Sequence, residues 1–308
     1  MGFGPTPQSN DLMSRGSERY PSVQNFRKIL MMMAVVAAAA MLLLATGPAM
    51  LPSHAQHSPV NANAANCNCV IIRVDDIQDY WKQKPQIALL DIFINDSASL
   101  SVGMVMNHFG SDPVIVNKVK EGGSLFEYGI HGWDHVDYAT LSAPQQQETI
   151  SKAQAKMESV MGRSAKVFLP PYNGFDTNTL IAIKLSGLEI ISASKADANP
   201  YAPANDTLGI MHMPQSTTYG FTGSDGRSHQ WRTIEEMKSA VDADIDARGW
   251  AVVTIHPQDF ATYDENGKML DLADRERLDT FKAFMQQLRE EGKTLATFER
   301  AVQTMNRE

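Results

Sequence analysis

The chain of 308 residues is 43% hydrophobic and 20% charged, and its formal net charge is −8. This composition is ordinary for a folded protein and excludes a chain that is disordered over most of its length. No run of Lys and Arg alternates with aromatic residues, so the electrostatic footprint of a nucleic-acid partner is missing.

The N-terminal part of the chain is predicted to direct export. Residues 29–51 read as an apolar signal peptide or membrane anchor, preceded by a cytoplasmic n-region, 1–28, that carries the basic residues. No Lys or Arg follows the apolar run until Arg73, and this asymmetry places the N-terminus in the cytoplasm. The run is long for a signal-peptide core and short for a comfortable membrane span, so cleavage and anchoring both remain open. We therefore expect an extracytoplasmic protein, secreted or held at the membrane.

A spacer and one folded domain are expected to follow. Residues 52–66 are rich in Pro, Ser, Asn and Ala without apolar periodicity, which indicates a flexible spacer. The remaining part, 67–308, has a length of about 240 residues and suits one α/β domain of barrel size. Its only cysteines, Cys67 and Cys69, bracket one asparagine, so a bridge between them would constrain almost nothing. Free thiols and a strained local disulfide are both compatible with this spacing.

Strand and helix patterns alternate through the folded part. Short β-branched runs indicate strands, and longer segments bounded by Pro, Gly or capping residues indicate helices. Repeated strand, loop and helix order predicts a parallel sheet with helices outside, and at this length a closed or nearly closed barrel is favoured over an open doubly wound sheet. The predicted strands are 69–74, 100–106, 126–130, 165–169, 189–193, 209–213 and 250–255, and the predicted helices are 85–95, 112–120, 143–161, 177–185, 233–248 and 278–291. Residues 294–298 are expected to begin a closing strand or turn before a last helix.

Polar residues gather where predicted strands end. Asp75-Asp76, His131 with His135, Pro170-Pro171-Tyr172 and His256-Pro257 each follow directly on a separate strand. In a parallel barrel the carboxyl ends of all strands meet on one face, which is where such folds carry their active sites. The four groups are therefore expected to lie together.

The residue types in these groups point to hydrolysis at a metal ion. If the segment after Ile130 is helical, His131 and His135 lie one turn apart on one face and can share an ion while leaving its other positions free. Adjacent residues of a strand point to opposite sides, so Asp75 and Asp76 are not expected to ligate the same ion. One carboxylate would join the histidines, and the other would accept the proton of a water molecule.

These four stretches, in this order, resemble the conserved motifs of the polysaccharide deacetylases, the NodB homology domain of carbohydrate esterase family four. The resemblance runs from about Val70 to the C-terminus and includes Thr254-Ile255-His256-Pro257 as the late histidine motif. It implies a distorted (β/α) barrel and metal-dependent removal of N-acetyl or O-acetyl groups from a glycan or a related small acetamide. It also implies a divalent cofactor, Zn²⁺ or else Co²⁺.

The same resemblance assigns a role to each candidate residue. Asp76 would bind the metal with His131 and His135, Asp75 would be the general base, and His256 would protonate the departing amine or alcohol. The backbone N–H of Tyr172, which Pro171 helps to hold, would stabilise the oxyanion. Trp133 is included among the substrate-binding candidates.

Two departures from the family pattern affect this assignment. The family commonly has arginine just before Pro-Pro-Tyr, where it steadies the catalytic aspartate, and this chain has Leu169. Its Asp-x-x-x-Trp motif has only a loose counterpart here, Asp197. We therefore expect an altered supporting shell or a substrate other than a common chitin-like polymer.

Two rival functions come from other classes of protein. An exported glycan-binding protein could have kept the barrel and lost turnover, but retention of Asp75 and His256 argues against it because binding alone requires neither a base nor an acid. Two histidines and one carboxylate also describe a non-haem iron enzyme, which is disfavoured because such enzymes usually have double-stranded β folds.

Overall fold

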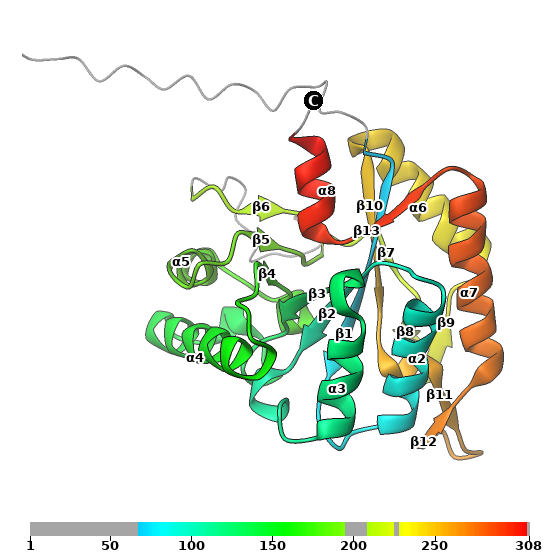
Figure 1. Cartoon of the computed structure of the whole chain (residues 1–308), viewed down its shortest axis with the longest axis horizontal. Coiled ribbons are helices and arrows are strands. Elements are labelled where there is room, and N and C mark those ends of the chain that lie inside the picture. Colours follow the sequence, from blue (N-terminus) through cyan, green and yellow to red (C-terminus); the bar gives the residue numbers. More distant parts are fainter. Residues whose placement is uncertain (1–66, 195–207, 225–227, 307–308) are drawn as a thin grey trace, which may run out of the picture. The chain divides into compact units, whose positions relative to one another are not determined.

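The structure is a computed structural model that describes residues 67–194, 208–224 and 228–306 (Figure 1). The expected n-region, apolar segment and spacer, and the loose motif residue Asp197, lie outside the described residues. No helix within the described ranges is long and apolar enough to cross a membrane.

A nine-stranded parallel sheet forms the centre of the domain. Its strand order is β6-β5-β4-β3-β2-β1-β10-β7, and β13 pairs with the first half of β1. Because β6 and β7 are the two ends of this order, the sheet within the described residues is a half-barrel, not the closed or nearly closed barrel that we expected. The strands are β1 (Cys69–Ile77), β2 (Leu100–Met104), β3 (Phe126–Ile130), β4 (Val167–Phe168), β5 (Ile190–Ile191), β6 (Met211–His212), β7 (Thr217–Thr218), β10 (Trp250–Ile255) and β13 (Thr294–Ala296).

Helices cover the outer face of this sheet (Figure 1). Neighbouring helices contact one another in the order α3, α2, α7, α6, and α4 packs on α5. Two small antiparallel hairpins, β8–β9 and β11–β12, complete the domain. The bounds are α2 (Gln83–Asn95), α3 (Pro113–Glu121), α4 (Ala143–Met161), α5 (Thr177–Leu185), α6 (Ile234–Arg248), α7 (Arg275–Glu290), α8 (Phe298–Met305), β8 (Gly220–Thr222), β9 (His229–Trp231), β11 (Ala261–Tyr263) and β12 (Met269–Ala273).

Helix ends form where the sequence supplies capping groups. Thr233 begins α6 with a capping box, in which its hydroxyl accepts from the Glu236 N–H and the Glu236 carboxylate accepts from the Thr233 N–H. Gly162 and Gly249 end α4 and α6 in the left-handed conformation that glycine adopts without steric cost. The Gly162 signal explains why the predicted α4 ends at the same residue as the observed helix.

Strand β1 divides its side chains between two apolar layers. Val70, Ile72 and Val74 pack with the helices on the outer face, whereas Cys69 and Ile71 belong to a separate cluster on the other face. Helix α8 closes that second cluster through Phe298 and Ala301. Because side chains alternate along a strand, Arg73 and Asp75 continue the inner series of β1 toward its carboxyl end.

Three features of the fold were not predicted from the sequence. Strand β7 and the hairpins β8–β9 and β11–β12 lie in segments that we left unassigned, since their strands have only two to five residues. Cys67 and Cys69 form a disulfide, which resolves the two alternatives left open by their spacing.

Candidate metal centre and active site

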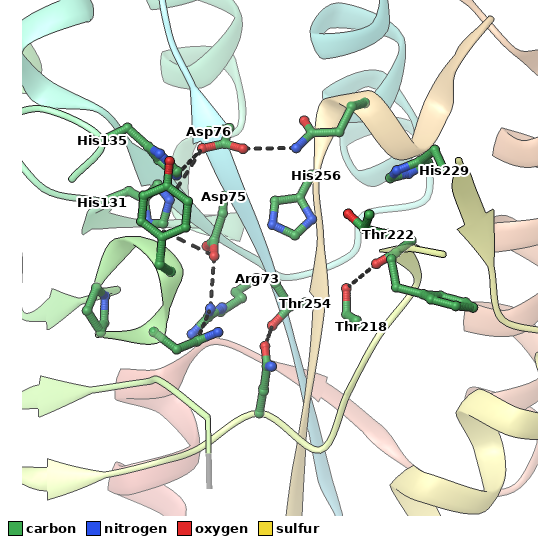
Figure 2. Close-up of a pocket in the computed structure, with 17 residues that line it drawn as sticks. Arg73, Asp75, Asp76, His131, His135, Thr218, Thr222, His229, Thr254 and His256 are labelled. Carbon is green, nitrogen blue, oxygen red and sulfur yellow. Dashed lines mark hydrogen bonds and ion pairs between the residues drawn. The ribbon is translucent and has the colours of Figure 1, made fainter. Parts of the chain in front are cut away.

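The four polar groups do meet at the carboxyl edge of the sheet. Strands β1, β3, β4 and β10 are parallel, and their last residues precede or contain the groups that we singled out. Asp75, Asp76, His131, His135, Tyr172 and His256 all line one cavity of about 330 Å³ (Figure 2).

A backbone irregularity brings both aspartates into this cavity. Asp76 has φ +65°, in the left-handed region that few non-glycine residues adopt, and the pairing of β1 with β2 shifts between Val74 and Ile77. The alternation that we expected to separate Asp75 from Asp76 is therefore broken at Asp76. Strained backbone of this kind costs about 1–3 kcal/mol and is found where a surrounding structure holds a functional side chain in place.

The histidine pair is placed by a loop and not by the helical turn that we considered. Residues 131–137 have no helical structure, and Gly132 turns the chain with φ +77°. The two imidazole rings nevertheless lie 5.0 Å apart. Nδ1 of His131 donates to the carbonyl oxygen of Leu169 at 2.7 Å, so a neutral His131 presents the lone pair of Nε2 to the cavity.

Asp76 completes a cluster with the geometry of a metal site. Its Oδ1 lies 3.3 Å from Nε2 of His131 and 3.2 Å from Nε2 of His135, and the three ligand atoms all lie within 4.8 Å of one another. Burial opposes ionisation of Asp76, but without a metal ion the two imidazoles in their protonated forms outweigh it, through hydrogen bonds and charge, and hold the pKa of the carboxyl below its ordinary value. The Asp76 carboxylate in turn raises the pKa of His135.

The donor set fits a divalent cation. The single N–H of neutral His131 is on Nδ1, where it bonds to the Leu169 carbonyl, so Nε2 has no proton to donate to Asp76. The lone pairs of Nε2 and of Oδ1 of Asp76 therefore face each other. A positive ion between the three atoms would satisfy all of them, and one carboxylate with two imidazoles leaves positions for water and substrate.

Asp75 is held differently, by a buried arginine. Nη2 of Arg73 donates to Oδ2 of Asp75 at 2.9 Å, and the two side chains are 2% and 3% exposed. Oδ1 of Asp75 is buried and has no hydrogen-bond partner among the described residues. One oxygen is thus fixed by Arg73, and the other is a buried acceptor of a residue that lines the cavity.

His256 stands beside a buried carboxylate that also binds a second histidine. Asp259, fully buried, accepts from the backbone N–H of His256 at 2.7 Å, and its Oδ2 lies 3.6 Å from Nδ1 of His256. Its other oxygen, Oδ1, lies 2.9 Å from Nε2 of His229 on β9. Burial alone lowers the pKa of His256, but Asp259 outweighs it and raises the pKa to about 9.

The remaining predicted residues take up different positions. Tyr172 lines the cavity with its ring edge-on to His135 at 4.6 Å, and its side chain is largely exposed. Pro171 is buried behind Tyr172 and does not line the cavity. Trp133 does not line it either, since its ring packs beneath Nζ of Lys152 and Lys156 at 4.9 and 5.6 Å.

Sequence reasoning missed four residues that support the site. Arg73 could have been found, because a charged residue inside an apolar strand requires a buried partner. Asp259 follows His256 by three residues, a spacing that brings the carboxylate back to the histidine in a tight turn. No local signal marks the other two, Gln258 and His229, because their contacts depend on segments distant in sequence.

Comparison with known proteins indicates the same family as the sequence motifs. Residues 62–191 match the polysaccharide deacetylase family. A chitin deacetylase from Pestalotiopsis sp is 27% identical over 176 residues, which are 54% of this chain and 57% of that protein. This chain therefore spans little more than half the length of that relative.

Solved structures show the same fold at low sequence identity. A polysaccharide deacetylase from Mycobacterium smegmatis, described as putative, aligns with a TM-score of 0.59 and 13% identity over 85% of this chain and 94% of its own. A pseudoenzyme of carbohydrate esterase family four from Bacillus anthracis aligns with a TM-score of 0.52 and 12% identity over 77% of this chain and 66% of its own.

A parallel half-barrel with an Asp–His–His cluster at its carboxyl edge defines the class, a carbohydrate esterase family four fold with a candidate metal centre. Residues 62–191 match the polysaccharide deacetylase family, which is the family that the motifs indicated.

Proposed function

We propose that the protein is a metal-dependent hydrolase that removes N-acetyl or O-acetyl groups from a glycan. One observation carries this proposal: a carboxylate and an imidazole outside the ligand cluster, Asp75 and His256, line the same cavity as the Asp76–His131–His135 ligands. A binding site requires neither of them, whereas hydrolysis requires a group that takes a proton and a group that gives one.

Asp75 has the position of the general base. Its carboxylate lines the cavity and has one oxygen without a described partner, so it has the capacity to accept the proton of the water that attacks the acetyl carbon. A divalent ion held by Asp76, His131 and His135 would polarise the acetyl carbonyl and ease ionisation of that water. Asp75 is not part of the three-residue ligand cluster, and Arg73 holds its Oδ2.

His256 has the position of the general acid. Because Asp259 raises its pKa to about 9, the imidazolium form persists at neutral pH and has a proton to donate. The proton would pass to the amine nitrogen or alkoxide oxygen as its bond to the acetyl carbon breaks. The products would be acetate and the free amine or alcohol.

Tyr172 offers two contacts to a substrate at the mouth of the cavity. Its exposed ring, edge-on to His135, is suited to pack against a sugar, and its backbone N–H is the candidate donor to the oxyanion. Buried Pro171 restricts the backbone that holds this N–H.

The test is acetate release from a panel of acetylated glycans and small acetamides. The purified protein is stripped of metal and reloaded with zinc or cobalt, and Asp75→Asn is the matched control. We expect metal-dependent acetate release that the variant loses. Equal release with and without metal, or equal release by Asp75→Asn, would contradict the proposed mechanism.

A glycan-binding protein without turnover is the second candidate, and Leu169 is the observation that favours it. The two functions separate in one measurement on the metal-loaded protein. Binding of an acetylated oligosaccharide with no acetate released over prolonged incubation would support the binding protein and exclude the hydrolase for that ligand.

We also propose that the domain 67–308 works outside the cytoplasm, secreted or anchored by residues 29–51. The proposal rests on the basic residues that precede the apolar run. Protease added to intact cells should digest the domain while a cytoplasmic marker survives. Protection of both proteins would contradict this location.

A further inference from the structure

We propose that Arg73 is a positioning residue for Asp75 and replaces, from strand β1, the cation that the family places just before Pro-Pro-Tyr. This inference rests on the proposed hydrolytic function, within which it assigns a residue that the family pattern does not. It makes Leu169 a compensated change and not a sign of lost activity.

Both terminal nitrogens of the Arg73 guanidinium are held by hydrogen bonds. Nη1 donates to the backbone carbonyl and, at 3.0 Å, to the hydroxyl of Ser192, which follows β5. Nη2 donates to Oδ2 of Asp75 at 2.9 Å and contacts Oδ1 of Asn173 at 3.3 Å (Figure 2). A planar guanidinium held at both terminal nitrogens cannot rotate without breaking several hydrogen bonds.

The alternation of β1 explains why the cation reaches Asp75 from this strand. Arg73 precedes Asp75 by two residues, so both side chains lie on the same face of β1. The family arginine would approach from the loop after β4, from the position that Leu169 occupies here. The two routes end at the same carboxylate.

Leu169 occupies the space beside Asp75 that a second cation would need. A Cβ placed on Gly103 would lie 2.8 Å from Cδ1 of Leu169 and 3.1 Å from Oδ1 of Asp75, so Leu169 and Asp75 flank the same small volume. Gly129, paired with Gly103 across β2 and β3, leaves room for the same methyl group, since a Cβ placed on Gly129 would lie 3.1 Å from Cδ1 of Leu169. Position 169 is therefore within reach of Asp75, and two glycines accommodate the apolar side chain that stands there.

The charge balance of this region permits one arginine and disfavours two. Asp75 and Arg73 are both almost fully buried, and an unpaired buried charge strongly destabilises a fold. Leu169→Arg in the otherwise unchanged protein would bury a second cation beside Arg73 and should destabilise the fold. The simple restoration of the family arginine is thus expected to fail while Arg73 is present.

The experiment moves the cation from one position to the other. The variants are Arg73→Leu, Arg73→Lys, Leu169→Arg and the double variant Arg73→Leu/Leu169→Arg, in the metal-loaded protein. For each, kcat, KM, metal affinity and Tm are measured. Arg248→Leu is the matched control, because Arg248 also pairs with an acidic side chain, Asp244, but does not line the cavity.

Positioning predicts a specific pattern across these variants. Arg73→Leu should lower kcat by about 10²-fold, the scale of loss that misplaced catalytic geometry produces, with little change in KM or metal affinity. The kcat of the double variant should be about tenfold or more above that of Arg73→Leu. The kcat of Arg73→Lys should lie between those of Arg73→Leu and the unaltered protein, because an ammonium group cannot reproduce the two-nitrogen fork of a guanidinium. Arg248→Leu should lower Tm and leave kcat unchanged.

A purely structural role predicts the opposite pattern. If Arg73→Leu lowers Tm while kcat below the transition is unchanged, or if the double variant recovers nothing although it folds and binds metal, the inference is overturned.

Failure of the proposed function is distinguishable from failure of this inference. If the unaltered protein releases no acetate from any substrate, the hydrolase is excluded, and crystal structures of the protein and Arg73→Leu decide the role of Arg73. Rotation of the Asp75 carboxylate in the variant supports positioning, and an unchanged carboxylate overturns it.

Discussion

Nε2 of Gln258 donates a hydrogen bond to Oδ2 of Asp76 at 3.0 Å, across 182 positions of sequence. The ligand oxygen Oδ1 faces the two histidines, and Gln258 holds the opposite oxygen from the short helix that follows β10. The orientation of the Asp76 carboxylate therefore depends on residues from both sides of β1, the histidines that follow β3 and the glutamine that follows β10.

Gln258→Met should weaken metal binding by about 10–100-fold, because outer-shell partners that orient a ligand contribute on this scale. Gln215→Met is a matched control, since Gln215 also lines the cavity but accepts from Thr254 instead of contacting a ligand. Metal titration of both variants by calorimetry tests the prediction. Equal affinities for the two variants would mean that the backbone alone orients Asp76.

The two adjacent aspartates should fail in different ways. Asp76→Asn, like His131→Ala or His135→Ala, removes a ligand and should weaken metal binding together with activity. Asp75→Asn keeps the three ligands and should retain metal while kcat falls by about 10²–10⁴-fold, the usual contribution of a positioned base. Metal titration beside acetate release separates the cases. Loss of metal from Asp75→Asn with retention by Asp76→Asn would reverse the two roles.

Most of the sheet could be predicted because its strands are continuous apolar runs. The predicted strands β3 and β10 match the observed ones at both ends, and each is buried along its whole length. The short strands of the β8–β9 and β11–β12 hairpins are partly exposed and carry few consecutive apolar residues, so they lack that signal.

The geometry within the site depended on backbone that pattern rules describe poorly. Alternation along a strand predicted opposite directions for Asp75 and Asp76, and the left-handed conformation of Asp76 overrides it. A helical turn would have spaced His131 and His135 suitably, but a loop turning at Gly132 achieves the same proximity. The residues at the strand ends could thus be identified from the sequence, whereas the backbone conformation that orients their side chains could not.

Glu127 should make stability depend on pH through helix α8. This carboxyl on β3 is buried, and its oxygens accept from the Ser101 hydroxyl and from the Phe298 and Glu299 N–H groups at the start of α8. Burial raises the pKa of Glu127 to about 7, and these hydrogen bonds offset only part of that effect.

Because the pKa of Glu127 is higher in the folded than in the unfolded protein, the folded state favours the protonated carboxyl. The contribution of Glu127 to stability is therefore fully present below pH about 4.5 and is lost as pH rises through about 7. The Tm of the unaltered protein should therefore fall between pH 5 and pH 8 by more than that of Glu127→Gln. Thermal unfolding of both proteins across this range is the measurement. Parallel Tm curves would show that Glu127 carries the same charge in the folded and unfolded states.

Asp259 should control the alkaline limit of activity through His256. The general acid must be protonated, so kcat/KM should fall as pH rises through about 9, the pKa to which Asp259 raises His256 against the effect of burial. Asp75 and Asp76 favour the same charged form from across the cavity, and His229 shares the Asp259 carboxylate.

Asp259→Asn removes the nearest anion and should move the alkaline limb to lower pH, toward the ordinary histidine value of about 6.5. Asp244→Asn is the control, because it neutralises a buried carboxylate that does not line the cavity. Both pH profiles are measured well below the unfolding temperature on metal-loaded protein. An alkaline limb that stays in place in Asp259→Asn would assign it to another group and remove His256 from the role of acid.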